Sequence, residues 1–208
     1  MFGLTDKEYS ILKNLSTPEK IQEYLDQLPI NHEKGGDTYM SPRRVFREKK
    51  AHCIEGALVA AAALMMHGEE PLLLDLKALR IDDDHVVALY RRHGYWGALS
   101  KTNHAVLRFR DPIYRTVREL ALSYFHEYFK TDTGQKTLQS YSRPLRLRRF
   151  GVAWLTAEED LWNIADALDA LPHFPLVPVA NRRYIRKASP LERQAGRLSE
   201  WEKKNHRT

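Results

Sequence analysis

The order of apolar and polar residues predicts helices in the first part of the chain. Between residues 18 and 28, apolar side chains recur at helical spacing behind a Thr17-Pro18 start, and Pro29 ends this helix. Ser41-Pro42 predicts a second, short helix that continues to about residue 50. These helices lead directly into the most apolar segment of the sequence.

That segment is an alanine-rich block that ends at Gly68. Residues 57–66 contain no polar side chain, and Glu55 is the last charged residue before them. A helix that is apolar on all sides must be buried on most of them, and Gly68 is suited to end it. Ten apolar residues are too few to cross a bilayer, so we expect no membrane-spanning segment. The block predicts a buried central helix.

Extended segments follow the buried helix. His93-Gly94 predicts a tight hairpin turn between two of them. Apolar runs of strand length, separated by polar turns, occupy residues 71–76, 85–91, 95–101 and 105–110. Helices before and after a small antiparallel sheet make an α+β fold, with the buried helix packed against the sheet.

The second half of the chain predicts mainly helices. Asp111-Pro112 marks a helix start, and apolar residues keep helical spacing to residue 129. Residues 138–150 read as extended, a capping box at residues 156–159 opens a helix to about 171, and residues 191–204 form a short basic helix. We expect residues 1–111 to form the core, and residues 112–208 to form a helical extension with a basic tail, packed on the same domain.

Charge is concentrated at the C-terminus. The chain has a net charge of +6, and residues 181–208, with nine Lys or Arg against three Glu, account for all of it. Such a tail can bind an acidic partner or nucleic acid, and it can equally be a solvated end. A single cysteine excludes an intramolecular disulfide, and residues 1–8 lack the start of a secretory signal, so we expect a cytoplasmic protein.

The single cysteine, Cys53, stands at the predicted start of the buried helix. There it faces the positive end of the helix dipole and unpaired backbone N–H groups. Both favour the thiolate, which is the nucleophilic form. Free cysteines often only fill space in a core, so position alone does not decide between packing and catalysis. A catalytic thiol also needs a base, usually histidine, and an acceptor that orients this base.

The order of residues from Cys53 onwards resembles the transglutaminase-like, papain-related superfamily. In that superfamily a cysteine starts a helix packed across an antiparallel sheet, and a histidine and an acidic residue follow on neighbouring strands. The matching residues are Cys53, then His85-Val86-Val87-Ala88-Leu89-Tyr90, then Gly94-Tyr95-Trp96, within residues 44–103. The resemblance implies a papain-like fold in which His85 accepts the proton of Cys53. The alternative for His85 is a structural histidine bonded to the acidic turn at residues 82–84.

The chain departs from the family pattern at the third position. Where the family has Asp four residues after the tryptophan, this chain has Ser100, and Asn103 follows three residues later. A hairpin turn at residues 92–93 would place Ser100 opposite His85, whereas a turn at residues 93–94 would place Thr102 opposite it and Ser100 diagonally. Asn103 would need a longer loop or a bulge. Ser100 and Asn103 both remain candidates to orient His85.

Two functions follow from these residues. The first is a thiol-dependent hydrolase or acyl transferase acting on an amide or ester bond, including a peptide, through Cys53 and His85. The second is a catalytically inactive module of the same fold that binds an acidic partner or nucleic acid through its basic tail. We expect no cofactor and no metal, because the consecutive acids at residues 82–84 cannot all face one ion and no cysteine or histidine cluster accompanies them.

Overall fold

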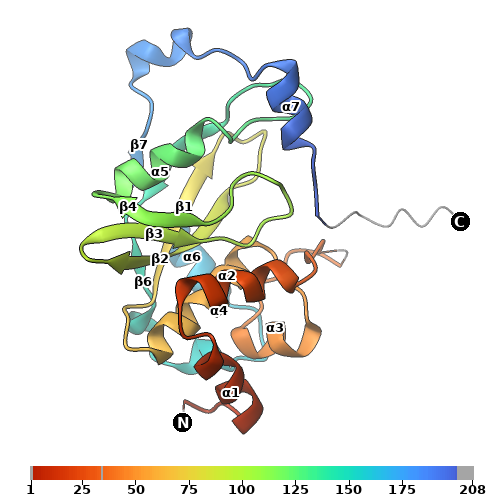
Figure 1. Ribbon diagram of the computed structural model, residues 1–208, viewed down its shortest axis with the longest axis vertical. Coiled ribbons are helices and arrows are strands. Elements are labelled where there is room, and N and C mark those ends of the chain that lie inside the picture. The colour runs from red at the N-terminus through yellow and green to blue at the C-terminus, as the bar shows by residue number, and fades with distance from the viewer. Residues whose placement is uncertain (1, 34, 201–208) are drawn as a thin grey trace, which may run out of the picture.

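Seven strands form one antiparallel sheet, with helices packed against both of its faces (Figure 1). The computed structural model describes residues 2–33 and 35–200. The helices are α1 (Asp6–Asn14), α2 (Pro18–Gln27), α3 (Pro42–Glu48), α4 (Cys53–Met66), α5 (Val117–Phe125), α6 (Trp162–Asp169) and α7 (Pro190–Gly196). The strands are β1 (Leu72–Ala78), β2 (His85–Arg92), β3 (Tyr95–Leu99), β4 (Arg110–Tyr114), β5 (Leu138–Ser142), β6 (Leu145–Arg146) and β7 (His173–Pro175). The predicted α+β class is therefore confirmed.

The strand order is β4-β3-β2-β1-β5-β7, and β6 also pairs with β1. Successive residues of the central strands enter two different cores. Leu73 and Ala88 pack with α4, whereas Leu74 and Leu89 pack with α5. A sheet covered on both faces needs apolar residues in succession, which explains why β1 and β2 do not alternate between apolar and polar residues.

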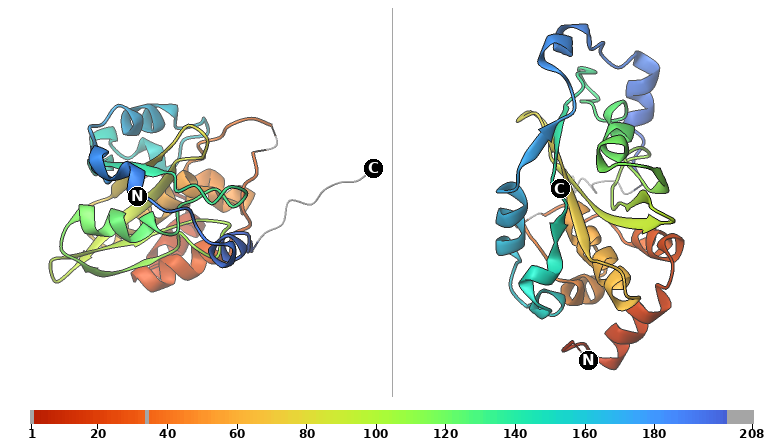
Figure 2. Two further views of the ribbon diagram at one scale, coloured as in Figure 1. Left: turned by 90° about the horizontal axis from the view of Figure 1, so that it is seen from above. Right: turned by 90° about the vertical axis from the view of Figure 1, so that its left-hand side faces the viewer.

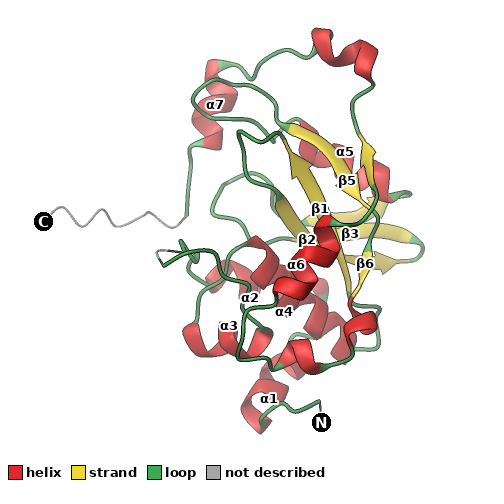
Figure 3. Ribbon diagram, turned by 180° about the vertical axis from the view of Figure 1, so that it is seen from behind, coloured by secondary structure: helices red, strands yellow, loops and turns green. Residues whose placement is uncertain are grey.

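Helix α4 lies at the centre of the larger core. All its residues from Ile54 to Leu64 are buried. The helix lies against β2 on one side, and α1, α2 and α3 cover it on the others (Figure 1). Viewed from behind, α6 crosses β1 on the same core (Figure 3). The buried helix predicted from the alanine-rich block is confirmed. Among the described helices, none combines the length and apolar character that crossing a membrane requires.

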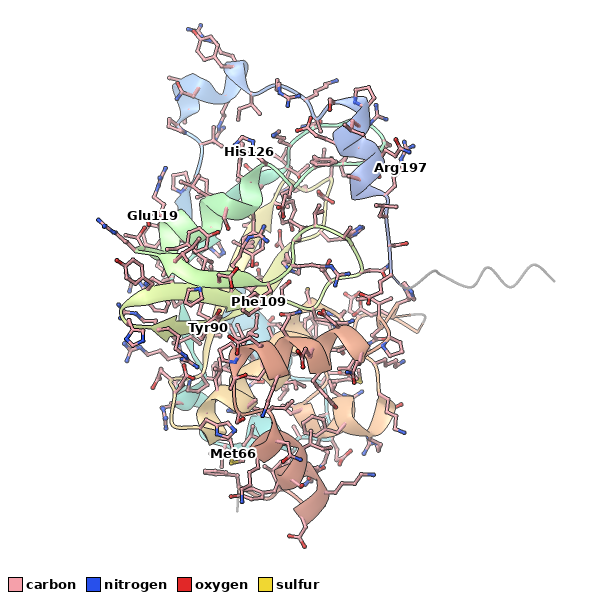
Figure 4. All side chains as sticks on the ribbon, viewed as in Figure 1. Met66, Tyr90, Phe109, Glu119, His126 and Arg197 are labelled. Atoms are coloured by element: carbon pink, nitrogen blue, oxygen red, sulfur yellow. The ribbon has the colours of Figure 1, made fainter. Side chains whose placement is uncertain are left out.

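The hairpin of β2 and β3 has the register that fixes the neighbourhood of His85. Ala88 pairs with Leu99 and Arg92 with Tyr95, so the two-residue turn is His93-Gly94. Both turn residues have positive φ, 49° and 89°, as a tight hairpin turn between twisted strands requires. Of the two registers considered from the sequence, this is the one in which Ser100 lies diagonally from His85. Next to the hairpin, Tyr90 stacks on Phe109 with ring centroids 5.9 Å apart (Figure 4).

The expectations for residues 105–129 are wrong at the boundary between strand and helix. The fourth strand covers residues 110–114 and not 105–110, and helix α5 begins at Val117 and not at Asp111. Thr116 caps α5 by accepting a hydrogen bond from the backbone N–H of Glu119. Pro112 lies on β4 at the edge of the sheet, where a missing N–H costs the sheet little.

The predicted helical extension is also corrected, because residues after 112 contribute strands to the main sheet. β5 pairs with β1, and β7 pairs with β5. The extended segment predicted at residues 138–150 is confirmed in β5, which supplies hydrogen bonds to an edge of β1 that would otherwise be unpaired, whereas β7 was not predicted. Helix α6 begins at Trp162, later than the capping box suggested. The preceding Asp160 instead accepts hydrogen bonds from the Tyr39 backbone and from Arg44, which holds this segment out of a helix.

Gly56 allows the chain after β3 to pass close to α4. A Cβ at this position would lie 2.4 Å from Cβ of Lys101, a buried residue. We expect Gly56→Ala to lower the free energy of unfolding by up to about 2 kcal/mol, because an overpacking cost of about 1–3 kcal/mol is opposed by a gain in helix propensity of about 1 kcal/mol. Urea denaturation measures this change. Gly35→Ala is the control, since nothing lies within 4 Å of its new Cβ. A Gly56→Ala variant more stable than the parent would contradict the close approach.

Candidate active site

Three of the four predicted site residues border one cavity of about 630 Å³, and the fourth, Ser100, is buried behind His85. Cys53 enters it from the first turn of α4, His85 from the start of β2, and Asn103 from the loop after β3. A further wall comes from the C-terminal segment, where Arg197 and Ser199 line the cavity. This segment lies beside the loop because the backbone N–H of Ala105 donates to the carbonyl of Leu198, which follows α7 (Figures 1 and 4).

His85 is bonded to Ser100. Nε2 of His85 lies 2.8 Å from Oγ of Ser100, and this Oγ lies 2.7 Å from the carbonyl oxygen of Leu107. A carbonyl can only accept, so the hydroxyl donates to Leu107 and accepts from Nε2–H of His85. His85 is thus held as the tautomer with its proton on Nε2, and Nδ1 is the nitrogen that can take up a proton. Ser100 fixes the tautomer, as an acidic residue would, but it adds no charge.

Ser100 is itself fixed from two directions. The side-chain amide of Gln22, on α2, donates to the carbonyl of Ser100 at 2.8 Å and accepts from its N–H at 3.0 Å. Leu107 has a left-handed backbone, with φ of 64°, and its N–H donates to the carboxylate of Glu127. Such backbone geometry in a residue other than glycine has a cost that surrounding contacts must offset. It directs the Leu107 carbonyl to the Ser100 hydroxyl.

The acidic turn before His85 has a structural role. Asp82 accepts a hydrogen bond from Thr137, and Asp84 accepts one from the backbone N–H of Ala78. His85 is therefore bonded to Ser100, which directly follows the neighbouring strand β3, and the turn carboxylates hold strand ends. Asp84 also approaches Asp75 and Asp169 closely enough for a shared ion. The ammonium of Lys77 lies 2.8 Å from both Asp84 and Asp169, so a cation of the chain itself already occupies this cluster.

His52 lies immediately before the cysteine and was not predicted from the sequence to have a role in the site. Nδ1 of His52 is 4.0 Å from Sγ of Cys53. On the other side of the ring, Nε2 is 2.7 Å from the carbonyl oxygen of Thr38, 3.3 Å from Glu55 and 3.4 Å from Glu33. A local signal was present in the sequence His52-Cys53-Ile54-Glu55. It places a carboxylate three residues after a helix cap, where it can turn back to the start of the helix.

Glu55 is a fully buried carboxylate that several donors hold ionised. It accepts from the hydroxyl of Thr38, from the backbone N–H groups of Met40 and His52, and from the amide of Asn31. Burial raises the pKa of Glu55, but the hydrogen bond and charge of His52 outweigh it and lower the pKa below its usual range.

Electrostatics favour a thiolate at Cys53. Burial on its own raises the pKa of the thiol, but interactions with His52 and then His85 outweigh it and lower the pKa to about 5. The opposite shift occurs in the partner. Burial lowers the pKa of His52, whereas the thiolate of Cys53 and the carboxylate of Glu55 raise it well above its usual range. The favoured state is an ion pair between thiolate and imidazolium.

Comparison with known protein families and with characterised proteins finds no match to this chain.

The ionisation of Cys53 can be measured directly. We expect the rate of alkylation by iodoacetamide, and the ultraviolet absorbance of the thiolate, to fall only when the pH falls through about 5. An ordinary thiol would lose its thiolate below about pH 8.5. Because Cys53 is the only cysteine, Cys53→Ser gives the background for both signals. A midpoint near the ordinary value would contradict the ion pair.

Proposed function

We propose that this protein is a thiol-dependent hydrolase or acyl transferase acting on an amide or ester bond. The observation that carries the proposal is a cysteine of lowered pKa at a helix N-terminus, beside an imidazole whose tautomer is fixed by Ser100. Cys53 and His85 border a cavity large enough for a substrate segment. A peptide, another amide or an ester carries the acyl carbon that such a thiolate attacks.

We include in this proposal a papain-like, transglutaminase-related fold for the core. Three features support it. Cys53 begins the buried helix α4, this helix lies against β2, and His85 begins that strand. The third position differs from the family pattern in chemical type, since Ser100 supplies a neutral hydroxyl where the family has a carboxylate. The seven strands and the contribution of residues after 112 extend beyond the segment that carries the resemblance.

The first half of the reaction forms a thioester. The thiolate of Cys53 attacks the acyl carbon, and its electron pair forms the carbon–sulfur bond while the carbonyl oxygen becomes an oxyanion. The backbone N–H of Cys53 is available to this oxyanion because the first N–H groups of a helix have no intrahelical acceptor. As the bond to the leaving amine or alcohol breaks, Nδ1 of His85 donates to the leaving atom a proton taken up from solvent, because the proton of the thiol stays on His52 in the ion pair.

The second half releases the acyl group. The neutral imidazole of His85 takes a proton from water, or from an amine or alcohol acceptor, as the oxygen or nitrogen of that molecule attacks the thioester carbon. The carbon–sulfur bond breaks and Cys53 leaves as a thiolate. His85 thus returns to its protonated form. Water as acceptor gives hydrolysis, and an amine or alcohol gives acyl transfer. The hydrogen bond from Nε2–H to Ser100 leaves Nδ1 as the nitrogen that exchanges protons in both halves.

Acylation by an activated ester tests the proposal. We expect p-nitrophenyl acetate to acetylate Cys53, with slow turnover afterwards, as followed by p-nitrophenolate release and by mass spectrometry of the modified peptide. His85→Ala is expected to lower turnover by about 10²–10⁴-fold, the usual contribution of a general acid–base group. A chain in which Cys53 stays unmodified under these conditions would rule out the thiol enzyme.

A serine variant tests the third position. Ser100→Ala removes the acceptor for Nε2–H of His85, so we expect a smaller loss of turnover than in His85→Ala. Ser142→Ala is the matched control. Ser142 is also a buried serine, but its Oγ accepts from the backbone N–H of Asp75 on β1. Equal losses of turnover in the two variants would mean that the effect comes from stability and not from the orientation of His85.

A specific surface feature favours the second candidate function, binding of an acidic partner or nucleic acid. The 3-10 helix η3 (Val179–Tyr184) lies at the end of the molecule opposite α1 (Figures 1 and 2). Arg182, Arg183 and Lys187 are exposed in or just after it, and Tyr184 is 71% exposed. Exposed basic side chains next to an aromatic ring are suited to phosphate groups and bases. Two other basic residues in the described part of the tail, Arg193 and Arg197, have an internal partner, since both donate to the carbonyl of Thr131.

Salt-dependent retention on heparin and on DNA tests this second function. We expect the triple variant Arg182→Glu, Arg183→Glu and Lys187→Glu to elute at clearly lower salt than the parent, because it replaces three contacts to phosphate or sulfate by repulsion. Glutamate at Arg143, Arg146 and Arg149, which are exposed elsewhere, is the charge-matched control. If both triple variants lose retention equally, net charge explains the binding and the η3 segment is not a specific site.

A further inference from the structure

Cys53 has two imidazole neighbours, and the groups behind them differ. Behind His85 stands the neutral hydroxyl of Ser100. Behind His52 stand two carboxylates, Glu55 and Glu33. We infer that His52 is the imidazolium that holds Cys53 as a thiolate, which leaves His85 to carry protons to and from the reacting bond. This inference rests on the proposed thiol chemistry and assigns a separate task to each histidine.

The hydrogen bonds of His52 determine which nitrogen can exchange a proton with the thiol. Nε2 lies 2.7 Å from the carbonyl oxygen of Thr38, which can only accept, so Nε2 carries a proton in every state. The remaining nitrogen, Nδ1, faces Sγ of Cys53. Ionisation therefore moves one proton from Sγ to Nδ1, and the products are a thiolate and an imidazolium with both nitrogens protonated. No other group gains or loses a proton in this step.

The carboxylates explain why the charged form of the pair is favoured. Glu55 is fully buried and ionised, and a buried carboxylate is stabilised most by a full positive charge nearby. Glu33 adds a second negative charge at 3.4 Å. The further titratable groups that interact with this pair are Tyr39, whose ring lies edge-on to His52 at 6.2 Å, His85, and Tyr128. Neither tyrosine supplies a positive charge, whereas His52 contacts both Glu55 and Cys53.

This arrangement accounts for the missing acid behind His85. The family pattern has a negative charge at the third position, behind the histidine. In this chain the negative charge near the site is that of Glu55, in the first turn of α4. The thiolate is therefore formed without help from a charged residue behind His85. His85 then has no permanent carboxylate partner at Nε2, and its Nδ1 can gain and lose a proton as the reaction proceeds. In this division, His52 sets the ionisation of Cys53 and His85 sets the rate of proton transfer.

Two glutamine variants of the full chain separate these tasks. We expect His52→Gln to raise the midpoint of the thiolate titration and to lower iodoacetamide labelling at about pH 6 by about tenfold or more, with recovery of the rate at high pH. Each unit of rise in the pKa of the thiol removes about tenfold of the thiolate below that pKa. His85→Gln should keep most of the thiolate absorbance at the same pH and lose turnover of p-nitrophenyl acetate. The inference is overturned if His85→Gln abolishes the low-pH thiolate and His52→Gln preserves it.

A measurement on the unmodified chain covers the case in which His52→Gln fails to fold. Nitrogen chemical shifts of the imidazole rings report which nitrogens are protonated. We expect both nitrogens of His52 to be protonated at neutral pH, and Cys53→Ser to lower the pKa of His52 by removing its anionic neighbour. A His52 ring that is neutral at Nδ1 in the parent would overturn the inference. If the low-pH thiolate depends on His52 but no ester is turned over, the ion pair stands and the proposed enzyme function fails.

Discussion

The covering of α4 is the constraint on which the rest of the structure depends. A helix with Ile54–Leu64 entirely apolar apart from Glu55 is stable only when other elements remove its whole circumference from water. β2 covers one side and the three N-terminal helices cover the others. The first turn borders the cavity of about 630 Å³, and this turn carries the thiol. The demand for burial thus also fixes the direction in which Cys53 points.

Glu55 is the exception within this apolar helix, and it organises the start of α4. A buried carboxylate is costly unless each oxygen has donors. The donors to Glu55 come from Thr38, Met40, Asn31 and His52. These hydrogen bonds hold the loop after α2 against the N-terminal end of α4. The same contacts bring His52 against Cys53. A single charged residue in the core therefore couples the stability of the loop to the electrostatics of the thiol.

The two histidines also illustrate how much local sequence can say. His52-Cys53-Ile54-Glu55 is contiguous, and its geometry follows from the start of a helix. His85 depends on partners 15 and 22 residues later, Ser100 and Leu107. The choice between Ser100 and Asn103 was open in the sequence because one residue of hairpin register changes the neighbour. Gln22, 78 residues from Ser100, had no local signal at all. Its role exists only because α2 lies beside the end of β3.

The sequence by itself determined the elements whose signals are local. These are the buried helix from Cys53, the caps at Thr17 and Ser41, and the His93-Gly94 turn, each confirmed at or near its expected position. The tertiary structure decided what depends on distant neighbours: the pairing of β5 with β1, the strand β7, the late start of α6, and the hydroxyl behind His85. The physical reason is that a short polar strand or a single hydrogen bond has little preference of its own. It takes the conformation that satisfies an exposed sheet edge or a buried polar group elsewhere in the fold.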